Sequence, residues 1–240
     1  MIIGVVGRPT ESENGRFFYK LSNELKEVIF QYQGVPLLIT GPSNYEEPLN
    51  NIEKERLHQQ IRMCDGIILQ GGSEIYPYDH EMITYIEQEN IPVLGICLGM
   101  QAMAEHAGGK IGKIPEDYIN HAQKAKEYVH FNQVKRSSKL FQILQVEEIK
   151  VNSRHHDMVL STNLDCSSYS TDGVIEAVEN GEKDFFIGVQ WHPESMFEYD
   201  KVSRKLWQTF FDSTRRYHEA RCVNRRIEAP SNQEGKKEEN

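Results

Sequence analysis

The sequence predicts one α/β domain with a mostly parallel central sheet and helices on both faces of that sheet. Its 240 residues suit one such domain better than two small ones, and 38% hydrophobic residues suffice for a sizeable core. Short β-branched runs alternate with longer segments whose apolar residues recur at helical spacing, which is typical of right-handed βαβ units. After about Lys110, strands follow one another with little helix between them, which favours an antiparallel extension of the same sheet.

The first half of the chain supplies the parallel strands and the helices that connect them. Apolar, β-branched runs predict strands over residues 2–6, 35–39, 66–69 and 91–96. Helical spacing predicts helices over residues 17–33, 52–63, 80–88 and 98–107. Gly34 marks the expected end of the first of these helices.

The second half supplies the extension and the last helix. Strands are predicted over residues 128–132, 148–152, 174–178 and 185–190, and a final helix over residues 201–217. We expect residues 1–220 to form the domain and residues 221–240 to form a charged, disordered tail. The last ten residues support the tail because they carry no apolar side chain to bury.

Composition excludes several classes of partner. The formal net charge of −9 and the pI of about 5.5 argue against nucleic acid or an anionic membrane surface. No apolar stretch approaches the roughly 18 residues of a membrane span, and the N-terminus lacks the basic flank of a signal peptide. The four cysteines show no paired spacing, which indicates free thiols in a reducing compartment. We therefore expect a cytoplasmic protein.

A candidate nucleophile lies between a predicted strand and a predicted helix. Gly95 and Gly99 bracket Cys97 in a Gly-x-Cys-x-Gly pattern, the cysteine version of the nucleophile elbow. The glycines give room for a sharp turn, and the following helix N-terminus favours a thiolate. A lone cysteine would more often be buried and inert, but this context favours the nucleophile.

His192 is the candidate general base. It follows the apolar strand at residues 185–190, and Glu194 would project to the same side of extended backbone, where its carboxylate can orient the imidazole. His155 and His156 form a rival pair, but adjacent residues point to opposite faces of a strand. No third ligand with suitable spacing accompanies them, so the local sequence predicts no metal site.

Two glycines supply the expected oxyanion side. Gly71 and Gly72 directly follow the third predicted strand, where backbone can approach a ligand closely. Their amides could complete an oxyanion hole together with the amide of Leu98. Neither a GxGxxG fingerprint nor a phosphate-binding GxxxxGK[ST] loop occurs, so nucleotide hydrolysis has no support in the sequence.

At this point the sequence resembles the class I glutamine amidotransferase superfamily. Residues 95–101 and 191–194 look like its two signature motifs, and the resemblance covers most of residues 1–215. It implies a three-layer, flavodoxin-like sandwich and a γ-glutamyl thioester mechanism without metal or organic cofactor. By similarity, the catalytic, oxyanion and pocket positions are Cys97, His192, Glu194, Gly72, Leu98 and Gln101.

Within this superfamily the chain looks most like the γ-glutamyl-γ-aminobutyrate hydrolase family. The loop at residues 71–77 and the Asn-Ser-x-His-His stretch at residues 152–156 carry that resemblance. Glu74 replaces the usual Asp, and the segment after the loop's proline is cut to a few residues, so the leaving amine is not identified. We expect one of His155 and His156, with His155 as the candidate, in the pocket wall and the other in a structural role. Arg154 could pair with an anionic leaving portion.

Three functions follow as hypotheses. The first is a stand-alone hydrolase that releases glutamate from a small γ-glutamyl amide; a folate poly-γ-glutamate hydrolase is a variant of it. The second is a glutaminase subunit that supplies ammonia to a separate synthetase, and the third is a non-enzymatic binding protein that keeps the scaffold. All three members of the expected triad are present, which favours an enzyme. The sequence leaves open whether the chain forms a homodimer.

Overall fold

Five parallel strands form the centre of the sheet, as expected. The structure is a computed structural model that describes residues 1–228. Its parallel strands lie in the order β4-β1-β5-β6-β13. Their bounds are β1 Ile2–Val6, β4 Val35–Ile39, β5 Gly66–Leu69, β6 Val93–Ile96 and β13 Phe186–Val189. Because these strands are parallel, the segments that follow β5, β6 and β13 leave at the same edge of the sheet.

An antiparallel extension continues the sheet beyond β13. Strands β12, β11, β8 and β9 follow in that order, and β10 joins β12 to β7. Their bounds are β7 Lys110–Lys113, β8 His130–Val134, β9 Glu148–Val151, β10 Asp157–Ser161, β11 Asp165–Ser170 and β12 Ile175–Glu179. The change of strand direction after about Lys110 is therefore confirmed.

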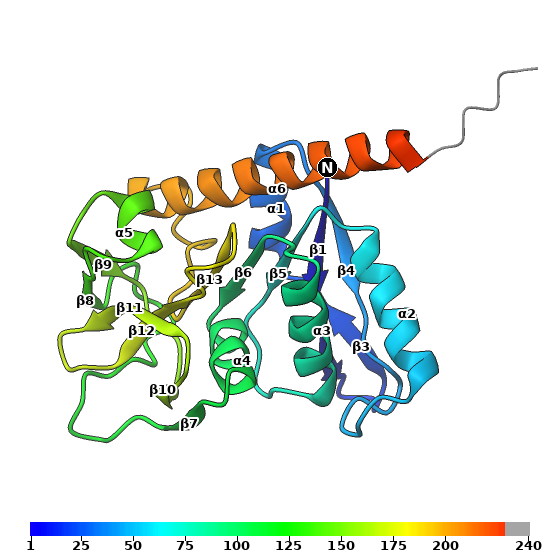
Figure 1. The fold of residues 1–240 in the computed structure, drawn as a ribbon. Helices are drawn as coiled ribbons and strands as arrows, with labels where there is room; N and C mark the ends of the chain where they lie inside the picture. The colour runs from blue at the N-terminus through cyan, green and yellow to red at the C-terminus, as the bar shows by residue number, and fades with distance from the viewer. Residues whose placement is uncertain (229–240) are drawn as a thin grey trace, which may run out of the picture.

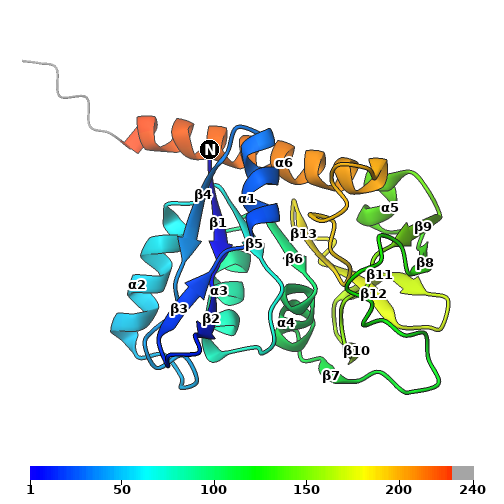
Figure 2. The same ribbon diagram turned by 180° about the vertical axis from the view of Figure 1, so that it is seen from behind.

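Helices cover both faces of the sheet and give three layers (Figure 1). One core packs α2 (Asn51–Arg62), α3 (Pro77–Gln88) and α4 (Leu98–His106) against one face. The other core packs α1 (Asn23–Gln31), α5 (Lys139–Leu144) and α6 (Lys201–Glu228) against the opposite face, which Figure 2 shows from behind. The predicted α/β class is confirmed. None of the helices in residues 1–228 is long and apolar enough to span a membrane.

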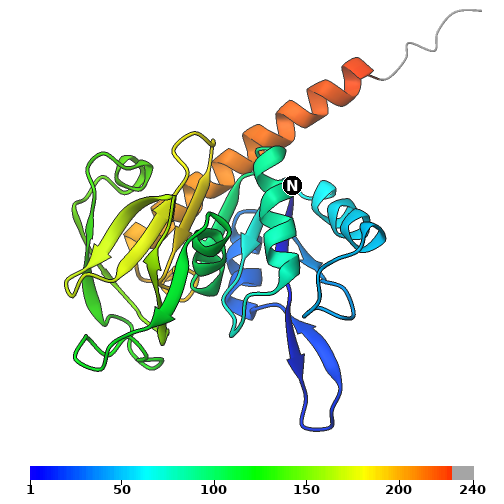
Figure 3. The same ribbon diagram turned by 60° about the horizontal axis from the view of Figure 1, so that its bottom comes forward.

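The structure corrects the helix predicted over residues 17–33. Strand β2 (Arg8–Glu11) pairs with β3 (Phe17–Lys20), and the helix α1 begins only at Asn23. The hairpin extends away from the body of the domain (Figure 3). Phe17 and Phe18 are exposed there, so the helical spacing of these residues does not reflect a buried helix face.

The final helix is longer than predicted. It continues past Tyr217 to Glu228, so the first eight residues of the expected tail are helical. The rest of that tail, residues 229–240, lies outside the described residues, and its disorder stays a prediction. The short elements β7, α5, β10 and β11 were not predicted.

Candidate active site

Cys97 lies on a strained turn between β6 and α4. Its backbone has φ 53° and ψ −105°, a conformation that L-residues rarely adopt, and it occupies the N-cap position of α4. A Cβ atom on Gly99 would lie 1.9 Å from the carbonyl oxygen of Leu69, so only glycine fits at that position. A Cβ atom on Gly95 would lie 2.4 Å from the sulfur of Met103. Tight packing on both sides therefore holds the thiol at the helix N-terminus.

Two residues position His192, one through its ring and the other through its backbone. Its Nδ1 lies 2.7 Å from Oε1 of Glu194, which leaves Nε2 for the thiol. Its backbone makes two hydrogen bonds with the side-chain amide of Asn152: the His192 amide donates at 2.8 Å, and its carbonyl accepts at 3.0 Å. Sequence patterns did not predict Asn152 as a positioning residue, because nothing local to the Asn-Ser-x-His-His stretch points to His192.

The charges of the thiol and the imidazole are coupled. Burial alone would raise the pKa of Cys97, but its hydrogen bond to His192 and the neighbouring imidazole charges lower the pKa below its ordinary value. Burial alone would lower the pKa of His192, but Glu194 and Cys97 together raise it to about 10. The site therefore favours a thiolate–imidazolium pair, the reactive form of a cysteine nucleophile.

The two glycines after β5 face this pair. A Cβ atom on Gly71 would lie 3.2 Å from Cε1 of His192 and 3.7 Å from Cβ of Cys97. On Gly72 a Cβ atom would lie 2.9 Å from Cδ2 of Leu98 and 3.0 Å from Cδ of Arg8. Gly71 thus lies against Cys97 and His192, while Gly72 packs against the side chains of Leu98 and Arg8.

A buried ion pair holds the glycine loop in place. Arg8 donates to both carboxylate oxygens of Asp79 at 2.8 Å and to the carbonyl oxygen of Gln70 at 3.2–3.3 Å. Asp79 also accepts from the amide of Tyr76, so the pair ties β2, the loop and α3 together. Both charged side chains are buried. Local sequence patterns carry no signal for this pair, because Arg8 and Asp79 are far apart in the chain.

These residues open onto one cavity of about 290 Å³. The predicted residues that line it are Cys97, His192, Glu194, Gly71, Gly72 and Arg154, and it is also lined by Ser22, Glu24, Leu25, Gln70 and Lys124. Cavities of about 410–420 Å³ lie elsewhere on the molecule, but they do not contain the reactive pair. Chemistry rather than size therefore identifies the candidate site.

Three predicted oxyanion or pocket residues, Leu98, Gln101 and His155, do not line this cavity. The Gln101 amide donates to the Asp157 carbonyl oxygen at 3.0 Å and to Oε1 of Gln190 at 3.1 Å. Nε2 of Gln190 lies 3.5 Å from the sulfur of Cys97, so Gln101 contacts Cys97 only indirectly, through Gln190. The His155 ring is buried beside the site, near Glu176 rather than in the cavity. The part of Gln101 and His155 in substrate binding stays a prediction.

Comparisons with known proteins find relatives named as glutamine amidotransferase-like or glutamine-hydrolysing proteins. The Peptidase C26 family model matches residues 78–194. The chain is 27% identical to the putative glutamine amidotransferase-like protein YvdE of Lactococcus lactis, over 89% of this chain and 99% of that protein. It is 30% identical to a glutamine-hydrolysing GMP synthase subunit of Methanococcus aeolicus, over 76% of this chain and 85% of that protein.

A solved structure shares the fold. The crystal structure of a putative GMP synthase subunit from Thermoplasma acidophilum matches with a TM-score of 0.63 and 21% identity, covering 92% of this chain and 98% of that one. This confirms the three-layer, flavodoxin-like arrangement that the sequence predicts. The relative that is 30% identical over most of both chains, together with the matched family model, shows that the chain belongs to the class I glutamine amidotransferase-like family of cysteine hydrolases, the Peptidase C26 type, which acts on amide bonds.

Proposed function

We propose that this protein cleaves the γ-glutamyl amide bond of a small γ-glutamyl compound and releases glutamate and an amine. The observation that carries the proposal is the meeting of Cys97, the His192–Glu194 pair and Gly71 in one cavity. A cavity of about 290 Å³ suits a glutamyl group better than a long polymer.

The chemistry follows from the placement of these groups. The thiolate of Cys97 attacks the γ-carbonyl carbon, and the backbone amides of Gly72 and Leu98 receive the developing oxyanion. When the C–N bond breaks, the imidazolium of His192 gives its proton to the leaving amine. The same imidazole then takes a proton from water, which attacks the thioester and releases glutamate, while the thiol is regenerated. Glu194 keeps the ring in one tautomer throughout.

Arg154 is the proposed contact for a charged part of the substrate. It lines the cavity, and its Nε is buried with no hydrogen-bond partner among the described residues. A buried donor of this kind calls for an acceptor, and a carboxylate is the best match for a guanidinium. We therefore propose that Arg154 binds a carboxylate carried by the leaving amine, as in a γ-glutamyl-aminobutyrate type of compound.

A glutaminase subunit is the second candidate. It is favoured by the 30% identity to a relative named as a glutamine-hydrolysing subunit of GMP synthase. Under this proposal the substrate is glutamine, the leaving group is ammonia, and a separate synthetase is the partner. Such a protein should speed up when its synthetase is added, whereas a stand-alone hydrolase needs no partner.

The test is glutamate release by the purified protein alone. The substrates are glutamine, γ-glutamyl-aminobutyrate and γ-glutamyl-ethylamine, each run beside Cys97→Ala. We expect the carboxylate-bearing amide to turn over fastest, and Arg154→Gln to raise its KM about 10-fold while leaving the KM for the ethylamide unchanged. Turnover of glutamine alone would support the glutaminase instead, and full activity in Cys97→Ala would exclude both candidates.

A further inference from the structure

Three histidines and one glutamate meet in the interior of the antiparallel extension. His130 lies on β8 and Glu176 on β12, while His121 and His155 lie on loops that the bridge Ala122–Arg154 joins. All four side chains are buried, with at most 5% of each residue exposed. One ligand atom from each residue lies within 4.8 Å of all the others.

The distances around Glu176 suit a tetrahedral metal ion. Its Oε1 lies 3.6 Å from Nδ1 of His121, 3.7 Å from Nε2 of His130 and 3.6 Å from Nε2 of His155. Zn²⁺ with nitrogen and oxygen ligands at about 2.0–2.1 Å requires ligand atoms about 3.3–3.4 Å apart. A contraction of a few tenths of an ångström would therefore bring each histidine nitrogen to tetrahedral spacing from Oε1. All four ligand atoms lie within 4.8 Å of one another, so binding would also draw the histidine nitrogens closer together.

The remaining polar atoms of three of these residues are held by neighbours. Nδ1 of His155 donates to the Asp157 carbonyl oxygen at 2.9 Å, which leaves Nε2 with its lone pair directed at the cluster. Nε2 of His121 lies 3.2 Å from the carboxylate of Asp172. Oε2 of Glu176 accepts from Asn132 at 3.3 Å. Outer partners of this kind orient histidine and carboxylate ligands in protein metal sites.

Three of the four inner atoms of the cluster have no hydrogen-bond partner among the described residues. Both ring nitrogens of His130, Nε2 of His155 and Oε1 of Glu176 are buried and unsatisfied, while Nδ1 of His121 has only the Ser153 hydroxyl at 3.1 Å. Burying such groups without partners is unfavourable, because their desolvation is not offset by a new bond. Glu176 and Asp172 could neutralise at most two imidazolium ions, so ion pairs alone do not account for three histidines.

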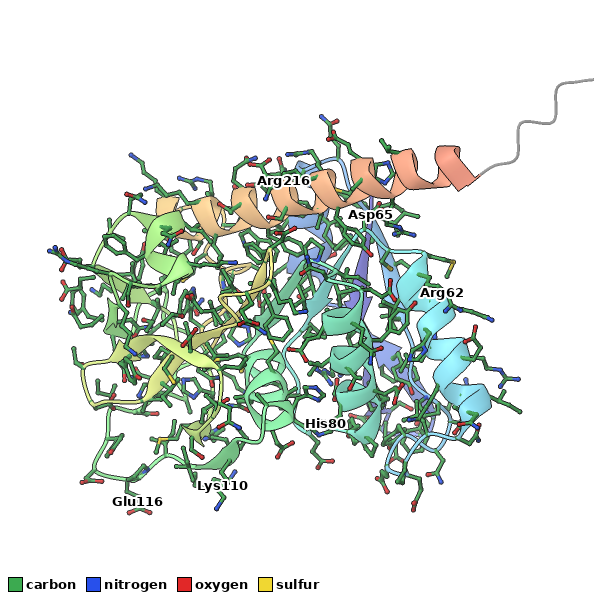
Figure 4. All side chains as sticks on the ribbon, in the orientation of Figure 1. Arg62, Asp65, His80, Lys110, Glu116 and Arg216 are labelled. Atoms are coloured by element: carbon green, nitrogen blue, oxygen red, sulfur yellow. The ribbon has the colours of Figure 1, made fainter. Side chains whose placement is uncertain are left out.

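We propose that His121, His130, His155 and Glu176 bind one Zn²⁺ ion in a closed, structural site. Three imidazoles and a carboxylate are a ligand set that zinc favours, and all four positions of the tetrahedron come from the protein. A cavity of about 410 Å³, lined by His121, His155 and the loop around Glu116, gives the ion a path from solvent. Figure 4 shows Glu116 on that loop at the lower edge of the molecule.

The proposed ion would brace the segment that supports the candidate catalytic histidine. Asn152, which holds the backbone of His192, lies three residues before the ligand His155. The carbonyl oxygen of Asp157 accepts from both His155 and Gln101, which reaches toward the nucleophile through Gln190. Zinc would therefore make the active-site wall more rigid without touching the substrate.

The local sequence predicts no metal site, because His155 and His156 have no third ligand near them in the chain. The ligands proposed here come from four separate segments, which only the folded sheet brings together. His156 is not a member of the cluster.

The experiment measures metal in the full chain after removal of any affinity tag. We expect about one zinc per chain by mass spectrometry of the metal content, and less than about one-tenth in Glu176→Gln and His130→Asn. His58→Asn is the matched control, because His58 pairs with Glu81 on the surface of α2 and α3, and it should retain its zinc. Replacement of zinc by Co²⁺ should give the intense visible absorption of tetrahedral cobalt in the wild type and the control only.

A second measurement keeps the test decisive if the variants fold poorly. Wild-type protein stripped by a chelator should melt about 5–10 °C lower and recover when Zn²⁺, but not Mg²⁺, is returned. A wild-type protein that carries no zinc, gains no cobalt spectrum and does not change its melting temperature with Zn²⁺ would overturn the proposal. Neither readout depends on catalysis, so failure of this site and failure of the proposed hydrolase are distinguishable.

Discussion

Among residues 1–228, a cysteine, a histidine and a carboxylate meet around Cys97 and again around Cys222, and only the first group lies in the candidate active site. On α6, the sulfur of Cys222 lies 3.6 Å from Nε2 of His218, whose Nδ1 lies 2.9 Å from Asp65. Figure 4 labels Asp65 beneath that helix. Judged by side chains alone, this array resembles the one around Cys97.

The difference lies in the backbone and in the surroundings. Cys97 caps the N-terminus of α4, where amides are free to hold an oxyanion, and it faces Gly71 across the cavity. Cys222 lies inside α6, where backbone amides are used by the helix itself. The side chain of His218 is 45% exposed, against 15% for His192, so water screens its pair far more. The comparison teaches that a reactive cysteine needs a prepared backbone as well as a base.

The largest expected effect separates the two cysteines directly. Cys97→Ala should lower kcat/KM for the preferred γ-glutamyl substrate by about 10⁴-fold or more, because no other group can form the thioester. Cys222→Ala should leave kcat/KM within about twofold of the wild type. Steady-state glutamate release measures both. A comparable loss in Cys222→Ala would mean that the wrong array has been assigned.

The next largest effect separates the carboxylates of the two arrays, Glu194 beside His192 and Asp65 beside His218. Glu194→Gln should lower kcat by about 10²–10⁴-fold, because an amide cannot stabilise the His192 imidazolium as a carboxylate does. Asp65→Asn should keep kcat, but it should lower the free energy of unfolding by about 1–2 kcal/mol. Asp65 also accepts from the amide of Ile2 at 2.7 Å and lies 3.4 Å from Arg221. Kinetics and urea denaturation of each variant distinguish these outcomes.

Substitutions of Gly71 and Gly99 test whether the backbone around Cys97 must lie as closely packed as it does. Gly71→Ala should fold but lose about 10–100-fold in kcat/KM, because its methyl group would press on the His192 ring at 3.2 Å. Gly99→Ala should lower the free energy of unfolding by about 3 kcal/mol or more, because its methyl group would overlap the carbonyl of Leu69.

The matched control for these two variants is Gly181→Ala. Its added methyl group would meet only the Asp165 carboxylate, at 3.5 Å. Thermal melting and kinetics should both be near those of the wild type. If Gly71→Ala is equally silent in activity, the loop at residues 71–72 does not border the reacting atoms.

The smallest expected effect is on the pH dependence of Cys97 alkylation and of turnover. The lowered pKa of Cys97 predicts that its alkylation by iodoacetamide, in a Cys166→Ala, Cys222→Ala background, stays fast below neutral pH. In His192→Asn the alkylation midpoint should move up toward that of an ordinary thiol. Turnover should fall at alkaline pH, as His192 loses its proton near its pKa of about 10 and can no longer protonate the leaving amine. An unshifted midpoint in His192→Asn would argue against the coupled pair.

Much of the fold could be predicted from local patterns. The runs at residues 2–6, 35–39 and 66–69 are strands with those bounds, because a short continuous apolar run is typical of a strand in a parallel sheet. The run at residues 35–39 forms the edge strand and is only partly buried. The pattern failed at residues 17–33, where spacing alone could not tell a hairpin strand from a helix. Short elements such as β10 and β11 were not predicted because their pattern is set by pairing across the sheet.

In the candidate site, too, some residues could be predicted from local patterns and others could not. Cys97 between two glycines, and His192 two residues before Glu194, are local arrangements that sequence spacing expresses directly. The supports of the site are not local: Asn152 holds His192, and Arg8 with Asp79 holds the glycine loop. Local sequence patterns do not predict these contacts, because the side chains meet only when the strands are paired in register.

The sequence by itself determined the alternation of strands and helices, the elbow at Cys97 and the family of the chain. These features depend on residues within a few positions of one another, where spacing fixes which side chains share a face or a turn. Only the tertiary structure decided that Arg154 lies in the cavity, that Gln101 lies behind the nucleophile and that three distant histidines surround Glu176. Such neighbours are set by the order and register of the strands, which local spacing does not encode.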